Sequence, residues 1–159
     1  LAARTDLSVS EARAFIDAYF GRFKGVKEYL ERTVEEAQET GYVATIMGRR
    51  RYFPELRSSG AVNQNVRRGA ERAAVNMPIQ GSAADVIKLA MIALYRRLRE
   101  EQLRSAMILQ VHDELVLEVP EEELDATRDL VVDTMESAYA LDVPLKVDAA
   151  VGKNWMEMK

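Results

Sequence analysis

Apolar residues recur at helical spacing through the first forty positions and predict two helices. Ser8 and Glu11 have the spacing of a capping box, which marks the start of the first helix. The second helix is expected to end at Gly41, because glycine adopts the left-handed conformation that closes a helix. The apolar positions are Ala12, Phe15, Ile16, Tyr19 and Phe20, and then Val26, Tyr29, Leu30, Val34 and Ala37.

The pattern then becomes β-prone. Residues 42–47 and 51–53 flank Gly48 and Arg49, which predicts a small hairpin with arginines at its tip. We expect Arg49, Arg50 and Arg51 to form a solvated tip, since nothing in the sequence identifies a partner for them. Residues 58–60 read as a loop and are our expected boundary between a region 1–60 and a region 61–159.

The second region mixes helices with strands. A polar helix over 62–76 is expected to be interrupted by Pro78, which lacks the N–H that a helix interior needs. An amphipathic helix to about residue 101 should follow, then strands at 106–111 and 115–119, a helix over 121–140 and a last strand over 145–151. This order predicts the α+β class.

Composition narrows the class of protein. The 159 residues include no cysteine, which excludes disulfides and thiolate sites and fits an intracellular, cytoplasmic protein. There is no uninterrupted apolar run of membrane-spanning length and no signal-peptide pattern, so we expect no membrane partner. Net charge is −4, but residues 47–72 hold seven arginines against two glutamates, and residues 111–142 hold eleven acids against one arginine. A basic segment can meet phosphates and an acidic one cations, although solvated faces are the usual explanation.

The most informative segment lies where the two apolar runs converge on His112, Asp113 and Glu114. We expect these three residues to form a tight turn held beside the core. Adjacent carboxylates there suit Mg²⁺, which prefers one or two carboxylates and leaves other positions to water and phosphate. The plainer interpretation is a common turn residue beside a surface glutamate, and on the pattern alone we favour it. Asp148 lies on the expected last strand, but nothing marks it as a second ligand.

Four segments, in order, resemble family A (polymerase I-like) DNA polymerases. Residues 110–115, Gln-Val-His-Asp-Glu-Leu, resemble motif C of the palm, and residues 71–85 resemble the segment that leads into its long helix. Residues 41–52 resemble the hairpin of the fingers, and residues 152–155 resemble the end of the chain. The resemblance implies a palm-type antiparallel sheet with packed helices in residues 61–159. It implies a mostly helical end of the fingers, with its small hairpin, in residues 1–60.

The resemblance also implies roles. Asp113 would be a catalytic metal ligand, Glu114 an accessory carboxylate and His112 a contact to the primer terminus. Arg72, Asn76 and Gln80 would lie along the minor groove or backbone of the primer–template, although Asn76 and Gln80 could equally be helix caps around Pro78. Two Mg²⁺ ions, deoxynucleoside triphosphates and primer–template DNA would complete the site, in replication or repair.

Two segments expected of the family do not occur in these 159 residues: the D-Y-S-x-I-E-like motif A strand and the motif B helix. We therefore expect the chain to begin after motif B, to be inactive alone and to self-associate through an unpaired apolar strand edge. Two alternatives stay open: a non-catalytic DNA-binding polymerase relic or module, and a related single-subunit RNA polymerase. The expected location is the bacterial cytoplasm, at the nucleoid.

Overall fold

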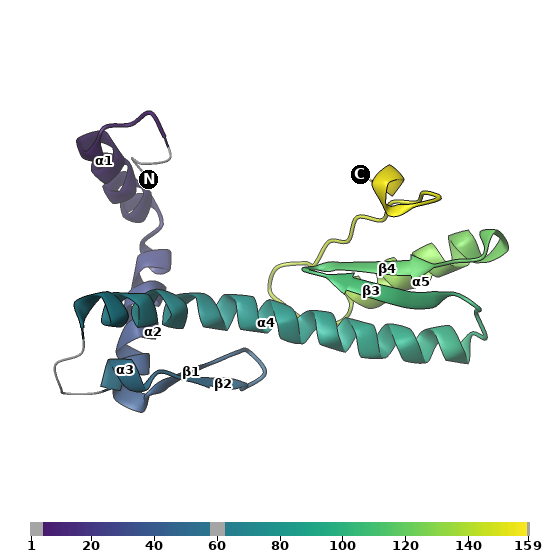
Figure 1. Cartoon of the computed structure of the whole chain (residues 1–159), viewed down its shortest axis with the longest axis horizontal. Helices are drawn as coiled ribbons and strands as arrows, with labels where there is room; N and C mark the ends of the chain where they lie inside the picture. Colours follow the sequence, from purple (N-terminus) through teal and green to yellow (C-terminus); the bar gives the residue numbers. More distant parts are fainter. Residues whose placement is uncertain (1–4, 58–62, 159) are drawn as a thin grey trace. The chain divides into compact units, whose positions relative to one another are not determined.

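The chain divides into two compact units, residues 1–79 and 80–159, which are described separately. The computed structural model describes residues 5–57 and 63–158. The first unit holds α1 (Val9–Arg22), α2 (Lys24–Thr40), β1 (Tyr42–Ala44), β2 (Arg50–Tyr52), α3 (Pro54–Arg57) and the first part of α4 (Gln64–Glu100) (Figure 1). The second unit holds the rest of α4, β3 (Ala106–Val111), β4 (Glu114–Glu118), η2 (Glu121–Glu123), α5 (Leu124–Glu136) and η3 (Trp155–Met158).

The first helix begins, and the second helix ends, where the sequence predicts. The Ser8 side chain accepts from the Glu11 backbone N–H at 3.3 Å, and the Glu11 carboxylate accepts from the Ser8 N–H at 2.9 Å. The hydrogen bonds from the Ser8 hydroxyl and then from its backbone N–H lower the pKa of Glu11. Gly41 closes α2 with φ of 81°, in the left-handed region. The capping box and the glycine C-cap are therefore confirmed.

The predicted basic hairpin is present and covers the core of the first unit. Tyr42 pairs with Tyr52, Val43 with Arg51 and Ala44 with Arg50 in an antiparallel ladder. Strand side chains alternate between faces, so Val43 points into the core while its neighbours on β1 point away. The core consists of Ala37, Val43, Phe53, Leu56, Ala74 and Met77.

Helix α4 continues through Pro78, so the predicted interruption there is wrong. Proline cannot donate to the carbonyl of Ala74, and in a helix interior it costs about 3 kcal/mol relative to alanine. Ala74 and Met77 are both buried in the core of the first unit. Their packing holds the turn before Pro78 helical and offsets the missing hydrogen bond.

Helix α4 also has the length and composition of a membrane span. An 18-residue window in it has a mean hydropathy of 1.3, although no uninterrupted apolar run of that length exists. Only 22% of that window is buried. Length and composition alone are weak grounds for a membrane span, because core helices pass the same test, so the expected absence of a membrane partner stays a prediction.

The second unit packs the β3–β4 hairpin against two helices (Figure 1). Leu94 and Leu98 of α4 meet Leu130 of α5, and all three are almost completely buried. Side chains of the hairpin and its approach complete this core: Leu103, Met107, Leu115 and Leu117, with Val131 of α5. A helix-rich chain with two small antiparallel sheets results, which confirms the α+β class.

Two predictions for the end of the chain are wrong. Helix α5 ends at Glu136 instead of residue 140, because the Ala138 N–H turns to the Met135 carbonyl, three residues back instead of four, and the Ser137 hydroxyl donates to the Asp133 carbonyl. No strand forms over 145–151. A strand needs a partner strand for its backbone hydrogen bonds. Here the Val147 N–H donates to the Glu136 carboxylate at 3.1 Å instead. Leu145 and Val147 are half-buried, and the residues after each of them are exposed. The segment therefore shows the alternating burial of a strand without strand pairing.

The units divide within α4, between residues 79 and 80, and not at the expected loop. Residues 58–60 lie outside the described residues. The assignment of residues 1–60 to the fingers and 61–159 to the palm stays a prediction.

Candidate active site

The acidic hairpin, β3 and β4 with their turn, presents the candidate catalytic residues. Val111 pairs with Glu114, so the turn contains only His112 and Asp113. The expected three-residue turn is therefore wrong in one position: Glu114 is the first residue of β4, because its backbone completes the ladder. All three side chains are exposed.

The turn is held in an uncommon conformation. His112 has φ of 55°, in the left-handed region that costs most residues about 1–2 kcal/mol. The Gln110 side-chain amide donates to the His112 carbonyl and braces the turn from β3. The sequence places Gln110 at the start of the motif C-like segment but does not indicate that it braces the turn. Strain that is braced in this way is typical of functional sites.

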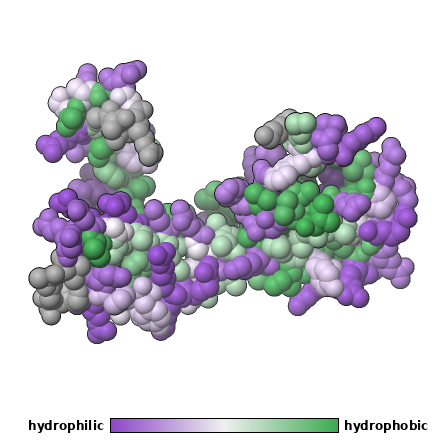
Figure 2. All heavy atoms as spheres, viewed as in Figure 1, coloured by the Kyte–Doolittle hydropathy of each residue, from purple (hydrophilic) through white to green (hydrophobic). Residues whose placement is uncertain are grey.

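A β-bulge in β3 sets the direction of the side chains before the turn. Met107 pairs with Leu117 and Leu109 with Val116, which leaves Ile108 as the extra residue. Met107 faces the core, whereas Ile108 and Leu109 are 59% and 43% exposed. Figure 2 shows apolar surface over this part of the molecule. The bulge therefore leaves an apolar face open on the acidic hairpin.

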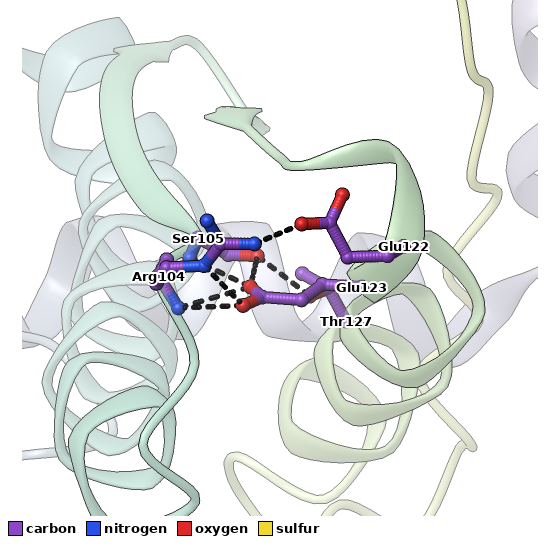
Figure 3. Close-up of polar contacts among 5 residues, drawn as sticks. All are labelled: Arg104, Ser105, Glu122, Glu123 and Thr127. Carbon is purple, nitrogen blue, oxygen red and sulfur yellow. Dashed lines mark hydrogen bonds and ion pairs between the residues drawn. The ribbon is translucent and has the colours of Figure 1, made fainter.

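A polar network anchors the start of β3 to the start of α5 (Figure 3). The Glu123 carboxylate accepts from the backbone N–H groups of Arg104 and Ser105 at 2.9 and 3.0 Å, and from the Ser105 hydroxyl at 2.9 Å. The Ser105 hydroxyl also lies 2.7 Å from the buried Thr127 hydroxyl. Arg104 forms ion pairs with Glu122 and Glu123. We did not predict this network, because its members lie about twenty residues apart.

The hydrogen bonds of this network lower the pKa values of its two carboxyl groups. Burial raises the pKa of Glu123, but hydrogen bonds from the Arg104 backbone and from Ser105 outweigh it, and the net pKa is lowered. The pKa of Glu122 is lowered by its own backbone N–H and then by Arg104. Both groups are therefore held as carboxylates that fix the base of the acidic hairpin.

Asp113 and Glu114 suit a hard cation. Within residues 5–57 and 63–158, neither side chain forms a hydrogen bond or an ion pair, so both carboxylates are available as oxygen donors. No group of three or more His, Asp or Glu side chains that could hold a metal is present among the described residues. The chemistry of the donors fits Mg²⁺, but two adjacent carboxylates supply only part of its coordination shell.

Three of the four candidate DNA-binding residues lie on α4, and the fourth, His112, lies at the turn of the acidic hairpin. Arg72 and Asn76 belong to the first unit and Gln80 to the second, and each is exposed. Because α4 is continuous through Pro78, Asn76 and Gln80 cap no helix end. The capping interpretation is therefore wrong, and both amides remain available as hydrogen-bond donors.

Comparison with known proteins identifies the class of this chain. Residues 1–157 match DNA polymerase family A, and the chain belongs to that family. Its full length is 53% identical to DNA polymerase I of Bacillus subtilis and 49% identical to the thermostable DNA polymerase I of Thermus filiformis. In both cases it spans 18% of the relative's length.

A solved structure agrees with this family. The POL domain of Pol1 from M. smegmatis, in complex with DNA primer-template and dNTP, matches 99% of this chain with a TM-score of 0.93 and 49% identity. The chain covers 27% of that structure. The resemblance to family A inferred from the four motifs is confirmed.

Proposed function

We propose that this chain is part of a DNA-directed DNA polymerase that extends a primer on a template by nucleotidyl transfer. The observation that carries the proposal is the close match to the M. smegmatis polymerase domain, whose complex holds primer-template and dNTP. The acidic hairpin supports it, because the hairpin offers two exposed carboxylates at or beside its braced turn, and neither pairs with a cation among the residues that the structure describes. The expected context is DNA replication or repair in the bacterial cytoplasm, at the nucleoid.

Within the proposed site, Asp113 and Glu114 hold Mg²⁺. Bound Mg²⁺ neutralises phosphate charge and favours ionisation of an attacking hydroxyl. The strained turn fixes the backbone from which the Asp113 side chain projects, since Gln110 braces the residue beside it. His112, at the same turn, contacts the primer terminus.

We assign Arg72, Asn76 and Gln80 to the primer–template. Every base pair offers acceptors at purine N3 and pyrimidine O2 in the minor groove, so amide and guanidinium donors there test pair geometry without reading sequence. Gln80→Ala should therefore weaken extension by similar factors on templates that differ in their terminal base pairs. Steady-state rates on such templates check the assignment, and a loss confined to one base pair would contradict it.

We further propose that these 159 residues do not extend a primer alone. Neither the motif A strand nor the motif B helix occurs among them. Ile108 and Leu109 leave apolar surface on the acidic hairpin, which forms a two-stranded sheet. Exposed apolar strands invite pairing with another copy, so light scattering should detect oligomers of the isolated chain.

The test of the function compares nucleotides. A longer polymerase that contains these residues is given a primed DNA template with four deoxynucleoside triphosphates or with four ribonucleoside triphosphates. We expect template-directed extension with the deoxynucleotides. Preference for ribonucleotides would favour the RNA polymerase alternative. DNA binding without extension by either set would favour the non-catalytic relic.

A further inference from the structure

The basic hairpin, β1 and β2 with their connecting loop, carries a second cluster of chemistry. The sequence alone suggested a solvated tip of arginines. In the structure, the Arg50 guanidinium lies 4.4 Å from the centre of the Tyr42 ring, and the Tyr42 and Tyr52 rings lie 5.7 Å apart. The arginine is therefore held against an aromatic pair and does not simply extend into solvent.

These three side chains share one face of the hairpin. The pairs Tyr42–Tyr52 and Ala44–Arg50 lie directly opposite each other in the ladder, and alternation puts both pairs on the same side. Arg51 pairs with Val43, whose side chain is buried in the core, so Arg51 belongs to the other face. Its guanidinium lies 5.2 Å from the centre of the Phe53 ring.

The charge on the aromatic face is not neutralised. Within the described residues, neither Arg50 nor Arg51 forms an ion pair, in a chain whose net charge is −4. A guanidinium stacked on a ring keeps the N–H donors in its own plane, where they can bind a phosphate. Tyr52 is 66% exposed, so much of its ring is open to a further stacking partner.

We propose that this face, Arg50 with Tyr42 and Tyr52, binds an unpaired nucleic-acid strand, with a phosphate on Arg50 and a base stacked on Tyr52. Residues two apart on a strand are separated by about 6.6 Å, so one nucleotide can contact both. An aromatic platform beside a cation suits single strands, because only an unpaired base exposes its face for stacking. The inference rests on the proposed function in naming the strand: for a primer-extending enzyme it is the uncopied template.

The experiment measures binding of labelled DNA by fluorescence anisotropy, using a polymerase that contains these residues. One probe is a primer–template with an unpaired template overhang, and the other is a blunt duplex of the same paired sequence. Tyr52→Ala and Arg50→Gln should each weaken binding of the overhang probe by about fivefold or more, the effect of losing one stacked base or one charged contact. Arg50→Gln should also reduce the slope of log K against log salt by about 0.7.

Two variants provide the controls. Arg51→Gln removes the same charge from the same hairpin on the other face and should leave binding of the overhang probe unchanged. Arg50→Lys keeps the charge but loses the planar stack, and it should weaken binding less than Arg50→Gln does. Circular dichroism checks that each variant is folded. We expect all of them to fold, because residues 50, 51 and 52 are exposed.

Three outcomes would overturn the inference: no loss in either test variant, an equal loss in Arg51→Gln, or an equal loss on the blunt duplex. No loss in either test variant would mean that the face does not contact the DNA. An equal loss in Arg51→Gln would mean a general effect of charge, and an equal loss on the blunt duplex would mean that the face contacts paired DNA. Primer extension by the unmodified polymerase is measured in parallel. Absence of extension would sink the proposed function, whereas the binding data test the basic face independently.

Discussion

The basic and acidic hairpins share a plan and differ at their turns. Each is a two-stranded antiparallel ladder over an apolar core, Val43 under one and Leu94 under the other. The basic hairpin turns at Gly48, with φ of 79°, a conformation that glycine adopts without a steric penalty. The acidic hairpin turns at His112, with φ of 55°, braced by Gln110. The first turn therefore forms without backbone strain, whereas the second holds a strained residue directly before the exposed Asp113.

The two hairpins also treat charge differently. Arg50 and Arg51 of the basic hairpin rest on aromatic rings, and ring contacts hold them in place without neutralising them. The carboxylates of the acidic hairpin make no such contact among the described residues, and their positions depend on the backbone beneath. The same supersecondary unit thus presents cationic side chains on one hairpin and carboxylates on the other, which is why we propose a phosphate for the first and a cation for the second.

The largest expected effects come from the cores beneath the hairpins. Leu94→Ala should cost about 3 kcal/mol of unfolding free energy and Val43→Ala about 2 kcal/mol, because both side chains are fully buried and alanine leaves the larger cavity at Leu94. Urea unfolding followed by circular dichroism measures both values. A larger loss at Val43 would show that the two cores have been ranked wrongly.

The turns should respond to substitution with opposite sign. Gly48→Ala should destabilise the chain by about 1 kcal/mol, because alanine at positive φ is strained even though the added methyl group meets open space. His112→Gly should stabilise it by up to about 0.5 kcal/mol, since relief of strain exceeds the extra chain entropy. Thermal unfolding of the two variants checks the signs. Destabilisation by His112→Gly would remove the contrast between the turns.

A smaller effect is expected on the stability of the fold at acidic pH. The folded-state pKa of Glu123 lies below its ordinary value of 4.5, so its stabilising contribution is complete above about that pH. The contribution is lost as pH falls through the folded-state pKa. Glu123→Gln should therefore flatten the acid limb of the stability curve in the acidic hairpin's unit, and Glu11→Gln should do the same for the first unit. Urea midpoints across the acid range test this, and an unchanged acid limb in Glu123→Gln would contradict it.

Local signals were predictable from the sequence and non-local ones were not. The capping box at Ser8 and the glycine at residue 41 depend on a few neighbouring residues, and both predictions were confirmed. The last strand failed because a ladder requires a partner that the pattern of one segment cannot reveal. Pro78 failed for a related reason, since packing of distant side chains overrode its local cost.

The candidate site divides in the same way. The motif located Asp113 at a hairpin turn, but the turn length and the bulge at Ile108 depend on pairing between strands. The network of Glu123 with Ser105 depends on contacts far apart in the chain. Placement of Arg50 on Tyr42 likewise required strand register, so the sequence alone left the tip as solvated charge.

The most direct test of the central claim is Asp113→Ala in a polymerase that contains these residues. We predict that primer extension falls by about a thousandfold or more, the scale of losing a preorganised group that stabilises charge in the transition state, while affinity for primer–template is largely retained. Asp142→Ala, which removes another exposed acid of the same unit, is the matched control and should extend normally. Near-normal extension by Asp113→Ala would contradict the assignment of the acidic hairpin to catalysis.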